Sequence, residues 1–409
     1  MTENGQCRFS IDEGVSVTES VQMSLPVLDS TTENRPYLTE QLITYIGNKR
    51  SLLKQIEGAI QKVRMDIGGE KIRFLDAFSG SGVVSRLAKS HSRFLVANDL
   101  EDYSAAINRC YLANRSSINR SYLHEIVKEL NAKAMDPKMG YGGFVQRLYA
   151  PQNDDHILPG ERVFYTSDNA RRLDFYGECL QSMDAAEKDL LTGPFLSAAS
   201  VHANTAGVFK GFYKDRNTGS GRFGGSGADA LHRIKGRIVL KEPVLSSFEC
   251  DTLAVQMDAN ELQALGQSYD LVYLDPPYNQ HPYGSNYFML NLLLHYREPS
   301  NISEVSGIPD DWRRSDYNVR SKAFHKFAEL IQAIDTRYFL ISFNDEGFIS
   351  PEDMRRLLAS VGEVQELKIS YNAFRGSRNL RDRKIHVTEH LFLVKVRNGL
   401  WQSGTNFDN

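Results

Sequence analysis

The chain has 409 residues and a formal net charge of −3, and its 41% hydrophobic and 24% charged residues are typical of a folded globular protein. No run approaches the roughly eighteen apolar residues of a membrane span, and the N-terminus lacks the basic and then apolar pattern of an export signal. The four cysteines, Cys7, Cys110, Cys179 and Cys250, are scattered without paired spacing. We therefore expect a cytoplasmic protein with neither a disulfide framework nor a zinc site.

The first part of the chain predicts an N-terminal arm followed by a strand, a helix and a second strand. Residues 1–36 are rich in Ser, Thr, Glu and Asn and lack periodicity, which indicates a disordered or loosely packed arm. Apolar residues at helical spacing predict a helix over 51–65. Residues 72–76 predict a strand, a glycine turn then leads into a helix that ends near Lys89, and 93–97 predict the next strand. This order is that of a βαβ unit.

Residues 116–244 interrupt that alternation with irregular segments and scattered Gly and Pro, so we expect an inserted domain. Between residues 205 and 241 the chain carries eight basic side chains and only two acidic ones. A local basic face is what contact with backbone phosphates requires, although a solvated surface loop would have the same composition.

The alternation of strands and helices resumes after the insert. Strands are predicted at 271–274, 337–343, 365–369 and 386–396, and helices at 322–334 and 352–360. We therefore predict an α/β fold with a mostly parallel sheet, whose ligands bind beyond the carboxyl ends of the strands. Residues 37–115 and 245–400 are assigned to this domain, 116–244 to the insert and 401–409 to a tail.

The segment Asp275, Pro276, Pro277 and Tyr278 follows the apolar run 269–274. Each proline fixes its own φ and restrains the preceding residue, so the flanking carbonyls have one orientation. The Asp275 carboxylate and the Pro276 carbonyl can then accept both N–H bonds of a planar exocyclic amine, and Tyr278 can stack on its base. The alternative is a tight turn that only ends the strand.

Two other segments predict a site for a nucleoside cofactor. Two glycines directly after a strand allow close approach of the backbone to a ligand, while Ser85 stands where a dinucleotide site would have its third glycine. Asp99 ends the next strand, where a carboxylate can accept ribose hydroxyls. Upstream, a Gly-Asn-Lys turn at a helix start can receive a carboxylate on Lys49, and Asp76 can receive an amino group. S-adenosylmethionine fits this set, which consists of Tyr45, Ile46, Gly47, Asn48 and Lys49, then Asp76, Ala77, Phe78, Ser79, Gly80, Ser81 and Gly82, and then Asp99 and Asp275.

The order of these motifs, Tyr-Ile-Gly-Asn-Lys, Phe-Ser-Gly-Ser-Gly, a long insert and Asp-Pro-Pro-Tyr, resembles the alpha-class, Dam-like DNA adenine-N6 methyltransferases over residues 40–397. Segment 202–212 is similar to the branch that contains restriction-modification methylases. The resemblance implies a Rossmann-like sheet of seven strands with the last antiparallel, S-adenosylmethionine as methyl donor, and a target-recognition domain in the insert.

It also implies transfer to an adenine flipped out of duplex DNA, with a cognate restriction endonuclease as the functional partner. Asp251 and Leu253 would border the cofactor adenine. The residues that would hold DNA phosphates are Lys210, Lys214, Arg216, Arg222, Arg375 and Arg378.

Other functions remain open from the sequence. An amino-methyltransferase for cytosine N4, RNA or a protein amide is the nearest rival, and a catalytically silent DNA-binding regulator is an alternative of another class. The segment His386 to His390 matches the inverted zinc-protease pattern His-x-x-Glu-His, but its β-branched, alternating run favours a strand. The two imidazoles would then lie about 13 Å apart, too far for one zinc ion, so no metal is expected.

Overall fold

The structure, a computed structural model, describes residues 33–225, 229–372 and 386–397. The described residues form one compact unit. Most of the predicted N-terminal arm, the predicted tail and the predicted phosphate ligands Arg375 and Arg378 lie outside the described residues.

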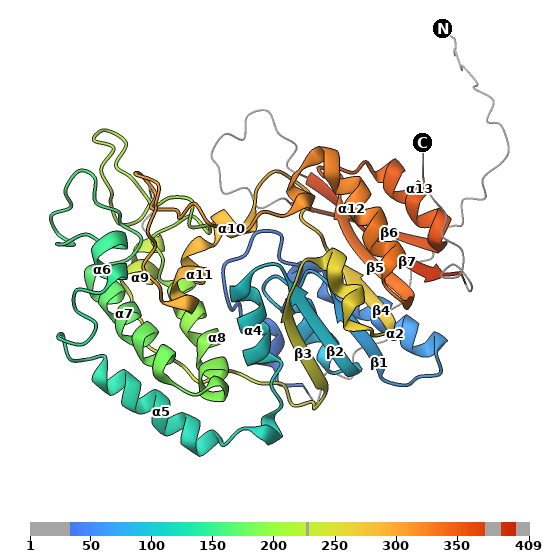
Figure 1. The fold of residues 1–409 in the computed structure, drawn as a ribbon, viewed down its shortest axis with the longest axis horizontal. Helices are drawn as coiled ribbons and strands as arrows, with labels where there is room; N and C mark the ends of the chain where they lie inside the picture. The colour runs from blue at the N-terminus through green and yellow to red at the C-terminus, as the bar shows by residue number, and fades with distance from the viewer. Residues whose placement is uncertain (1–32, 226–228, 373–385, 398–409) are drawn as a thin grey trace, which may run out of the picture. The chain divides into compact units, whose positions relative to one another are not determined.

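The described residues form one seven-stranded sheet with the order β3-β2-β1-β4-β5-β7-β6 (Figure 1). Its strands are β1 (Ile72–Asp76), β2 (Ser92–Asp99), β3 (Asp251–Gln256), β4 (Tyr269–Leu274), β5 (Thr336–Asn344), β6 (Gly362–Asn372) and β7 (His386–Val396). The pairs from β3 through to β5 are parallel, and β7 runs antiparallel to both β5 and β6. The predicted mostly parallel sheet with an antiparallel last strand is confirmed.

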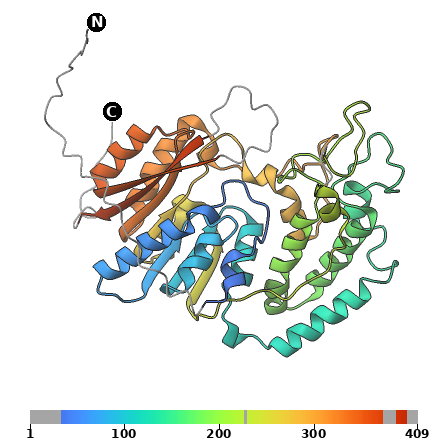
Figure 2. The same cartoon turned by 180° about the vertical axis from the view of Figure 1, so that it is seen from behind.

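The sheet is buried on both faces by helices, which explains why its central strands are apolar throughout. All six residues of β4 are buried. One face packs on α2 (Leu53–Asp66) and α3 (Val83–Lys89), and α2 lies across that face in Figure 2. The other face packs on η3 (Ala259–Leu265), α12 (Arg320–Ala333) and α13 (Pro351–Val361). These positions agree with the helices predicted at 51–65, 322–334 and 352–360.

The segment 116–244 contains helices where the sequence indicated irregular structure, which is a correction. They are α5 (Arg120–Lys133), α6 (Phe144–Tyr149), α7 (Ser167–Ser182), α8 (Ala185–Val201) and α9 (Asp229–Lys235). Helix α8 lacked a recognisable period because it packs against α4 (Asp102–Tyr111), α7 and α11 (Phe288–His295), so apolar residues surround it. Gly193 lies where α8 meets α4, and a Cβ there would be 2.7 Å from Cys110 Sγ.

The remaining elements are short and lie at the ends of strands or between the larger helices. They are α1 (Arg35–Thr39), η1 (Arg50–Leu52), η2 (Arg115–Ser117), α10 (Tyr283–Asn286) and η4 (Asp316–Asn318). Helix α1 begins inside the stretch predicted as an arm, and Tyr37 in it is fully buried. Whether 116–244 acts as a separate recognition domain stays a prediction.

Candidate active site

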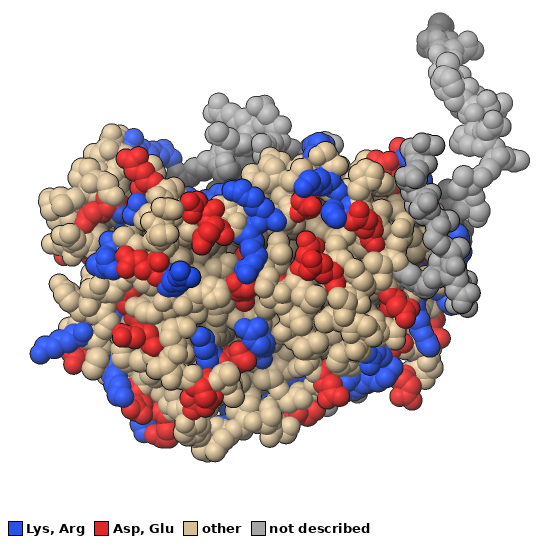
Figure 3. Space-filling view, viewed as in Figure 1, with Lys and Arg blue, Asp and Glu red and all other residues tan. Residues whose placement is uncertain are grey.

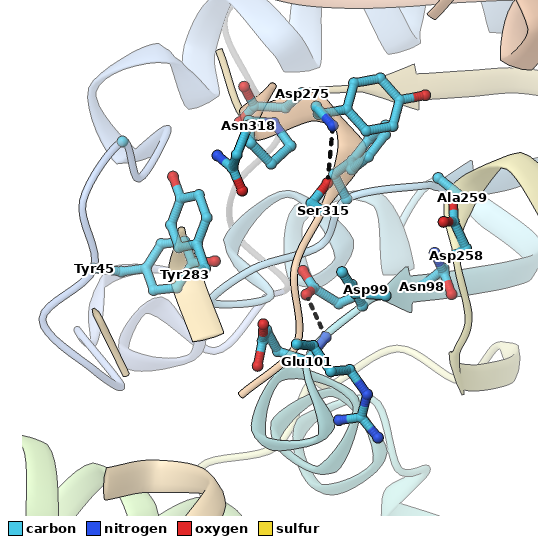
Figure 4. A pocket seen from close by; sticks show the side chains of 16 residues that line it. Tyr45, Asn98, Asp99, Glu101, Asp258, Ala259, Asp275, Tyr283, Ser315 and Asn318 are labelled. Atoms are coloured by element: carbon cyan, nitrogen blue, oxygen red, sulfur yellow. Dashed lines mark hydrogen bonds between the residues drawn. The ribbon is translucent and has the colours of Figure 1, made fainter. Parts of the chain in front are cut away.

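One cleft, with about 690 Å³ of empty space that includes open solvent, lies at the carboxyl ends of the parallel strands. Phe78 lines it from the turn after β1, Asp99 lines it from the end of β2, and Asp275 and Pro277 line it from the turn after β4. Figure 4 shows Asp99 and Asp275 in the same cavity, with Tyr45 and Tyr283 side by side on another wall. The two halves of the site that the sequence predicted separately therefore open onto one space.

The glycine turn after β1 is held by the carboxylate at the end of β2. Gly80 N–H donates to Asp99 Oδ2 at 2.8 Å, and Glu101 N–H donates to Asp99 Oδ1 at 2.9 Å. Gly80 has φ of +51°, and a Cβ there would lie 2.7 Å from the Tyr45 ring. Only glycine therefore fits this turn without moving Tyr45. Asp99 fixes the turn as well as lining the cleft.

Asp76, the last residue of β1, is a fully buried carboxylate with an incomplete set of partners. Its Oδ2 accepts a hydrogen bond from Ser85 Oγ at 2.6 Å, while its Oδ1 has no hydrogen-bond partner among the described residues. Burial raises the pKa of Asp76 to about 7. A buried, unpartnered acceptor of this kind fits a ligand that brings a cationic amino group.

The segment from Tyr45 to Lys49 is positioned by aromatic rings. Tyr45 stacks on Tyr283 and on Tyr287, each with a centroid separation of 5.0 Å. The hydroxyl of Tyr287 accepts from Ile46 N–H at 2.8 Å, and the hydroxyl of Tyr283 donates to Ile46 O at 3.1 Å. Gly47 then lines the cleft. These contacts fix the backbone just before the lysine.

Lys49 forms ion pairs with two carboxylates. Its Nζ lies 3.0 Å from Asp275 Oδ1 and 3.0 Å from Glu389 Oε1, and the side chain is only 6% exposed. Burial alone would lower the pKa of Lys49, but Asp275 and Glu389 outweigh it and leave that pKa well above the usual value. The sequence assigned this ammonium to a cofactor carboxylate, whereas in the structure the protein supplies both of its anionic partners.

Asp275 is a carboxylate with a raised pKa. Burial raises the pKa of Asp275 to about 6, Lys49 opposes that shift and Glu389 adds to it. Its side chain keeps 17% of its surface exposed in the cleft. The group is therefore ionised at neutral pH and accessible to a ligand.

Tyr278 lies beside the Lys49 ammonium, 5.9 Å from it to the ring centroid. Its backbone carbonyl accepts from Phe348 N–H at 2.9 Å, in the turn after β5. Segment 309–319, here called the bridging segment, also reaches the cleft: Tyr317 packs edge-on against Phe78 at 5.2 Å, and Asn318 donates to Asn279 O at 2.7 Å. The sequence analysis did not identify the bridging segment.

The structure does not bring Asp251 and Leu253 to the cleft. Asp251 is exposed at the start of β3 and pairs with Phe94, five residues before Asp99 in β2. The residues that line the cleft follow the end of β3 and are Asp258 and Ala259. Both follow Gln256, the last residue of β3, which agrees with ligands binding beyond the carboxyl ends of strands.

Glu101 is another carboxylate in the cleft that the sequence analysis missed. It is 3% exposed, accepts from Asn291 Nδ2 at 2.8 Å, and burial raises its pKa to about 7. Its position two residues after Asp99 was the signal that could have revealed it.

The predicted basic residues of the insert lie in the loops between α8 and α9. Phe209 N–H donates to Asn286 O at 2.7 Å, which fixes this loop to α10. Lys210, Lys214 and Arg216 are exposed, and Arg222 is partly buried and donates to Gly224 O. Over the face in Figure 3, Lys and Arg are interspersed with Asp and Glu, so the basic character is local.

The segment His386 to His390 lies on strand β7, as predicted. Adjacent residues face opposite ways on a strand: Glu389 meets Lys49, and His390 Nδ1 lies 2.6 Å from Glu366 Oε1. Among the described residues, no group of three His, Cys, Asp or Glu is placed to hold a metal ion. Within the same residues, each helix is too short or too polar to cross a membrane.

The family model of the D12 class N6 adenine-specific DNA methyltransferases matches residues 45–184 and 200–357, which is most of the chain. The chain belongs to this family. Type II methyltransferase M.NlaIII of Neisseria lactamica is 28% identical over 86% of this chain and 99% of its own length. Type II methyltransferase M.CviAII of Paramecium bursaria Chlorella virus 1 is 27% identical over 87% and 98%, and modification methylase StsI of Streptococcus sanguinis is 27% identical over 86% and 51%.

The family resemblance, the enzyme class and adenine-specific DNA methylation predicted from the sequence are thus confirmed. The rival acceptors and the silent regulator are not favoured. A DNA methyltransferase requires a methyl donor and a DNA substrate, and the cleft lined by Asp99 and Asp275 is the candidate site for both.

Proposed function

We propose that this methyltransferase transfers the methyl group of S-adenosylmethionine to N6 of an adenine that is flipped out of duplex DNA within a short fixed sequence. The observation that carries the proposal is the single cleft lined by both Asp99 and Asp275. A donor held on one side and an amine held on the other can reach in-line attack distance only if they share such a space.

The donor side of the cleft fits this cofactor. Asp99 and Glu101 would accept ribose hydroxyls, and Phe78, Asp258 and Ala259 would surround the adenine. Asp76, which is fully buried and not among the residues that line the cleft, would accept the amino group of the methionine part on its Oδ1. When bound, S-adenosylmethionine supplies an electrophilic methyl group on a positively charged sulfur. The glycine turn permits close approach because Gly80 has no side chain.

The acceptor side acts on the target amine. The Asp275 carboxylate and the Pro276 carbonyl each accept one N–H of the adenine amino group, which favours a pyramidal nitrogen whose lone pair can attack. Asp275 also stabilises the positive charge that develops on nitrogen. Tyr278 stacks on the flipped base, and after transfer the surplus amine proton leaves to solvent.

The loops of the insert hold the DNA. Lys210, Lys214, Arg216 and Arg222 contact backbone phosphates, and the insert as a whole acts as the target-recognition domain. The two type II methyltransferases named above match over nearly their whole length, which supports a role as the modification enzyme of a restriction-modification system with a cognate endonuclease.

Transfer of a tritiated methyl group to duplex DNA tests the proposal. Asp275→Ala should abolish transfer, whereas Asp335→Ala, which removes an exposed carboxylate at the opposite end of the same sheet, should leave it unchanged. Nucleoside analysis of the product should give N6-methyladenine, and sequencing of DNA from expressing cells should give one short context. Transfer that survives Asp275→Ala would refute the mechanism, and methylcytosine would refute the acceptor.

A further inference from the structure

Glu389 is a buried carboxylate on β7, between Thr388 and His390. It is 1% exposed, and its neighbours along the strand, Leu391, Phe392 and Val394, are buried in the core. In the sheet it is paired with Asn344 at the end of β5. A charged group in such a position is destabilising unless it is paired and hydrogen-bonded. The residues that pair with Glu389 therefore indicate what role it has.

Its partners connect it to the active site. Glu389 Oε1 accepts a hydrogen bond from Ser342 Oγ at 2.5 Å and lies 3.0 Å from Lys49 Nζ. The same ammonium lies 3.0 Å from Asp275 Oδ1. One buried cation therefore joins the carboxylate of β7 to the carboxylate that follows β4.

We propose that Glu389 is a positioning residue for methyl transfer: it shares the Lys49 ammonium with Asp275, so that Asp275 is held in place without being neutralised. The inference rests on the proposed role of Asp275 as the acceptor of the target amine. If Lys49 had Asp275 as its only anionic partner, the pair would be neutral and would attract an amine weakly. With Glu389 included, one ammonium faces two carboxylates, and the group keeps a net charge of about −1 when both carboxylates are ionised.

The arrangement also fixes the geometry of the acceptor. Lys49 engages Oδ1 of Asp275, which leaves Oδ2 as the oxygen that the proposed function assigns to the target amine. Lys49 itself is held between Glu389 and a backbone that the hydroxyls of Tyr283 and Tyr287 clamp. A misplacement of about 1 Å in an acceptor can cost on the order of a hundredfold in rate, because the reacting atoms must be aligned.

The charge of Glu389 should shift the pKa of Asp275 in a direction that can be measured. The Glu389 charge raises the pKa of Asp275, and the Lys49 charge lowers it. Among the described residues, the titratable groups around Asp275 are Lys49, Asp76, Tyr273, Tyr278, Tyr283 and Glu389. Removing the charge of Glu389 must therefore lower the pKa of Asp275 and move the acidic limb of the rate profile to lower pH.

Single-turnover methyl transfer measured against pH with Glu389→Gln tests this inference, because the substitution removes the charge and keeps the shape. We expect the plateau rate to fall roughly tenfold to a hundredfold and the acidic limb to move down by up to about one pH unit, with cofactor and DNA affinities unchanged. Glu389→Asp should restore part of the rate. Glu363→Gln, an exposed carboxylate of the neighbouring strand, is the matched control and should behave as the unmodified enzyme.

The outcomes separate this inference from the proposed function. Suppose that Asp275→Ala is inactive while Glu389→Gln keeps the normal plateau rate and the normal acidic limb of the pH profile. Glu389 then has only a structural role, and this inference is overturned while the proposed function stands. If Asp275→Ala is active, the proposed mechanism fails first. Should Glu389→Gln not fold, Ser342→Ala removes the hydroxyl that holds the Glu389 carboxylate; a normal plateau rate in that variant overturns the inference, and a lowered rate with normal cofactor affinity supports it.

Discussion

Binding of S-adenosylmethionine should release a proton from Asp76. In the free enzyme, burial raises the pKa of Asp76 to about 7, and its Oδ1 has no hydrogen-bond partner within the described residues. A cationic amino group placed at that oxygen favours the ionised carboxylate and lowers its pKa. Because only the ionised form pairs with the ammonium, the protonated fraction of the free enzyme must lose its proton on binding.

The size of the effect follows from that pKa. With a value of about 7, the released fraction is about 0.9 proton at pH 6, about 0.5 at pH 7 and about 0.1 at pH 8. Proton release on binding also sets how the affinity for S-adenosylmethionine changes with pH. The affinity should weaken as pH falls below 7, by up to about tenfold for each pH unit. Above pH 8 Asp76 is almost fully ionised, so its titration should no longer change the affinity with pH.

Titration calorimetry in two buffers of different ionisation enthalpy measures the protons released at each pH. Asp76→Asn keeps an acceptor for Ser85 and removes the titration, so the release near pH 7 should disappear with it. Glu101→Gln is the control, because burial also raises the pKa of Glu101 to about 7 in the same cleft. Release that persists in Asp76→Asn and vanishes in Glu101→Gln would refute the assignment of the amino group to Asp76.

Three further predictions concern the acceptor, the glycine turn and the basic loop. Single-turnover methyl transfer should fall with a slope of one below about pH 6, because Asp275 must be ionised and its pKa is about 6; a flat rate down to pH 5 would contradict this. Gly80→Ala should lower the free energy of unfolding by roughly 2–4 kcal/mol, through φ strain and the Tyr45 contact. The control Gly142→Ala, with φ of +79° and open space around the Cβ, should lower it by about 1 kcal/mol. Equal losses of unfolding free energy in denaturant titrations would exclude a role for the Tyr45 contact. Lys210→Ala, Lys214→Ala and Arg216→Ala each remove one exposed charge from the basic loop. Each should reduce the slope of the logarithm of the DNA-binding constant against the logarithm of the salt concentration by about one. Lys128→Ala on α5 should leave that slope unchanged.

Local patterns in the sequence were enough to predict the strands and helices whose formation depends mainly on residues close together in the chain. The run 72–76 is a strand in the structure with the same bounds, and the helices at 51–65, 322–334 and 352–360 appear within a few residues. Glycine, proline and apolar periodicity act through the backbone of the segment that carries them, so they can be recognised without knowing the neighbours. Helix α8 was missed for the opposite reason, because burial on several sides removes the polar face that reveals a helix.

Patterns in the sequence placed Asp76 to Gly82, Asp99 and Asp275 to Tyr278 at the ends of strands, and parallel strands end at one edge of a sheet. Which side chains meet at that edge depends on the packing of the whole domain. Glu389 and the bridging segment come from distant parts of the chain, Asp258 rather than Asp251 lines the cleft, and Lys49 is shared between Asp275 and Glu389. Strand ends are encoded by neighbours in sequence, whereas the pairing of buried charges depends on the packing of β7 beside β5, which no local pattern records.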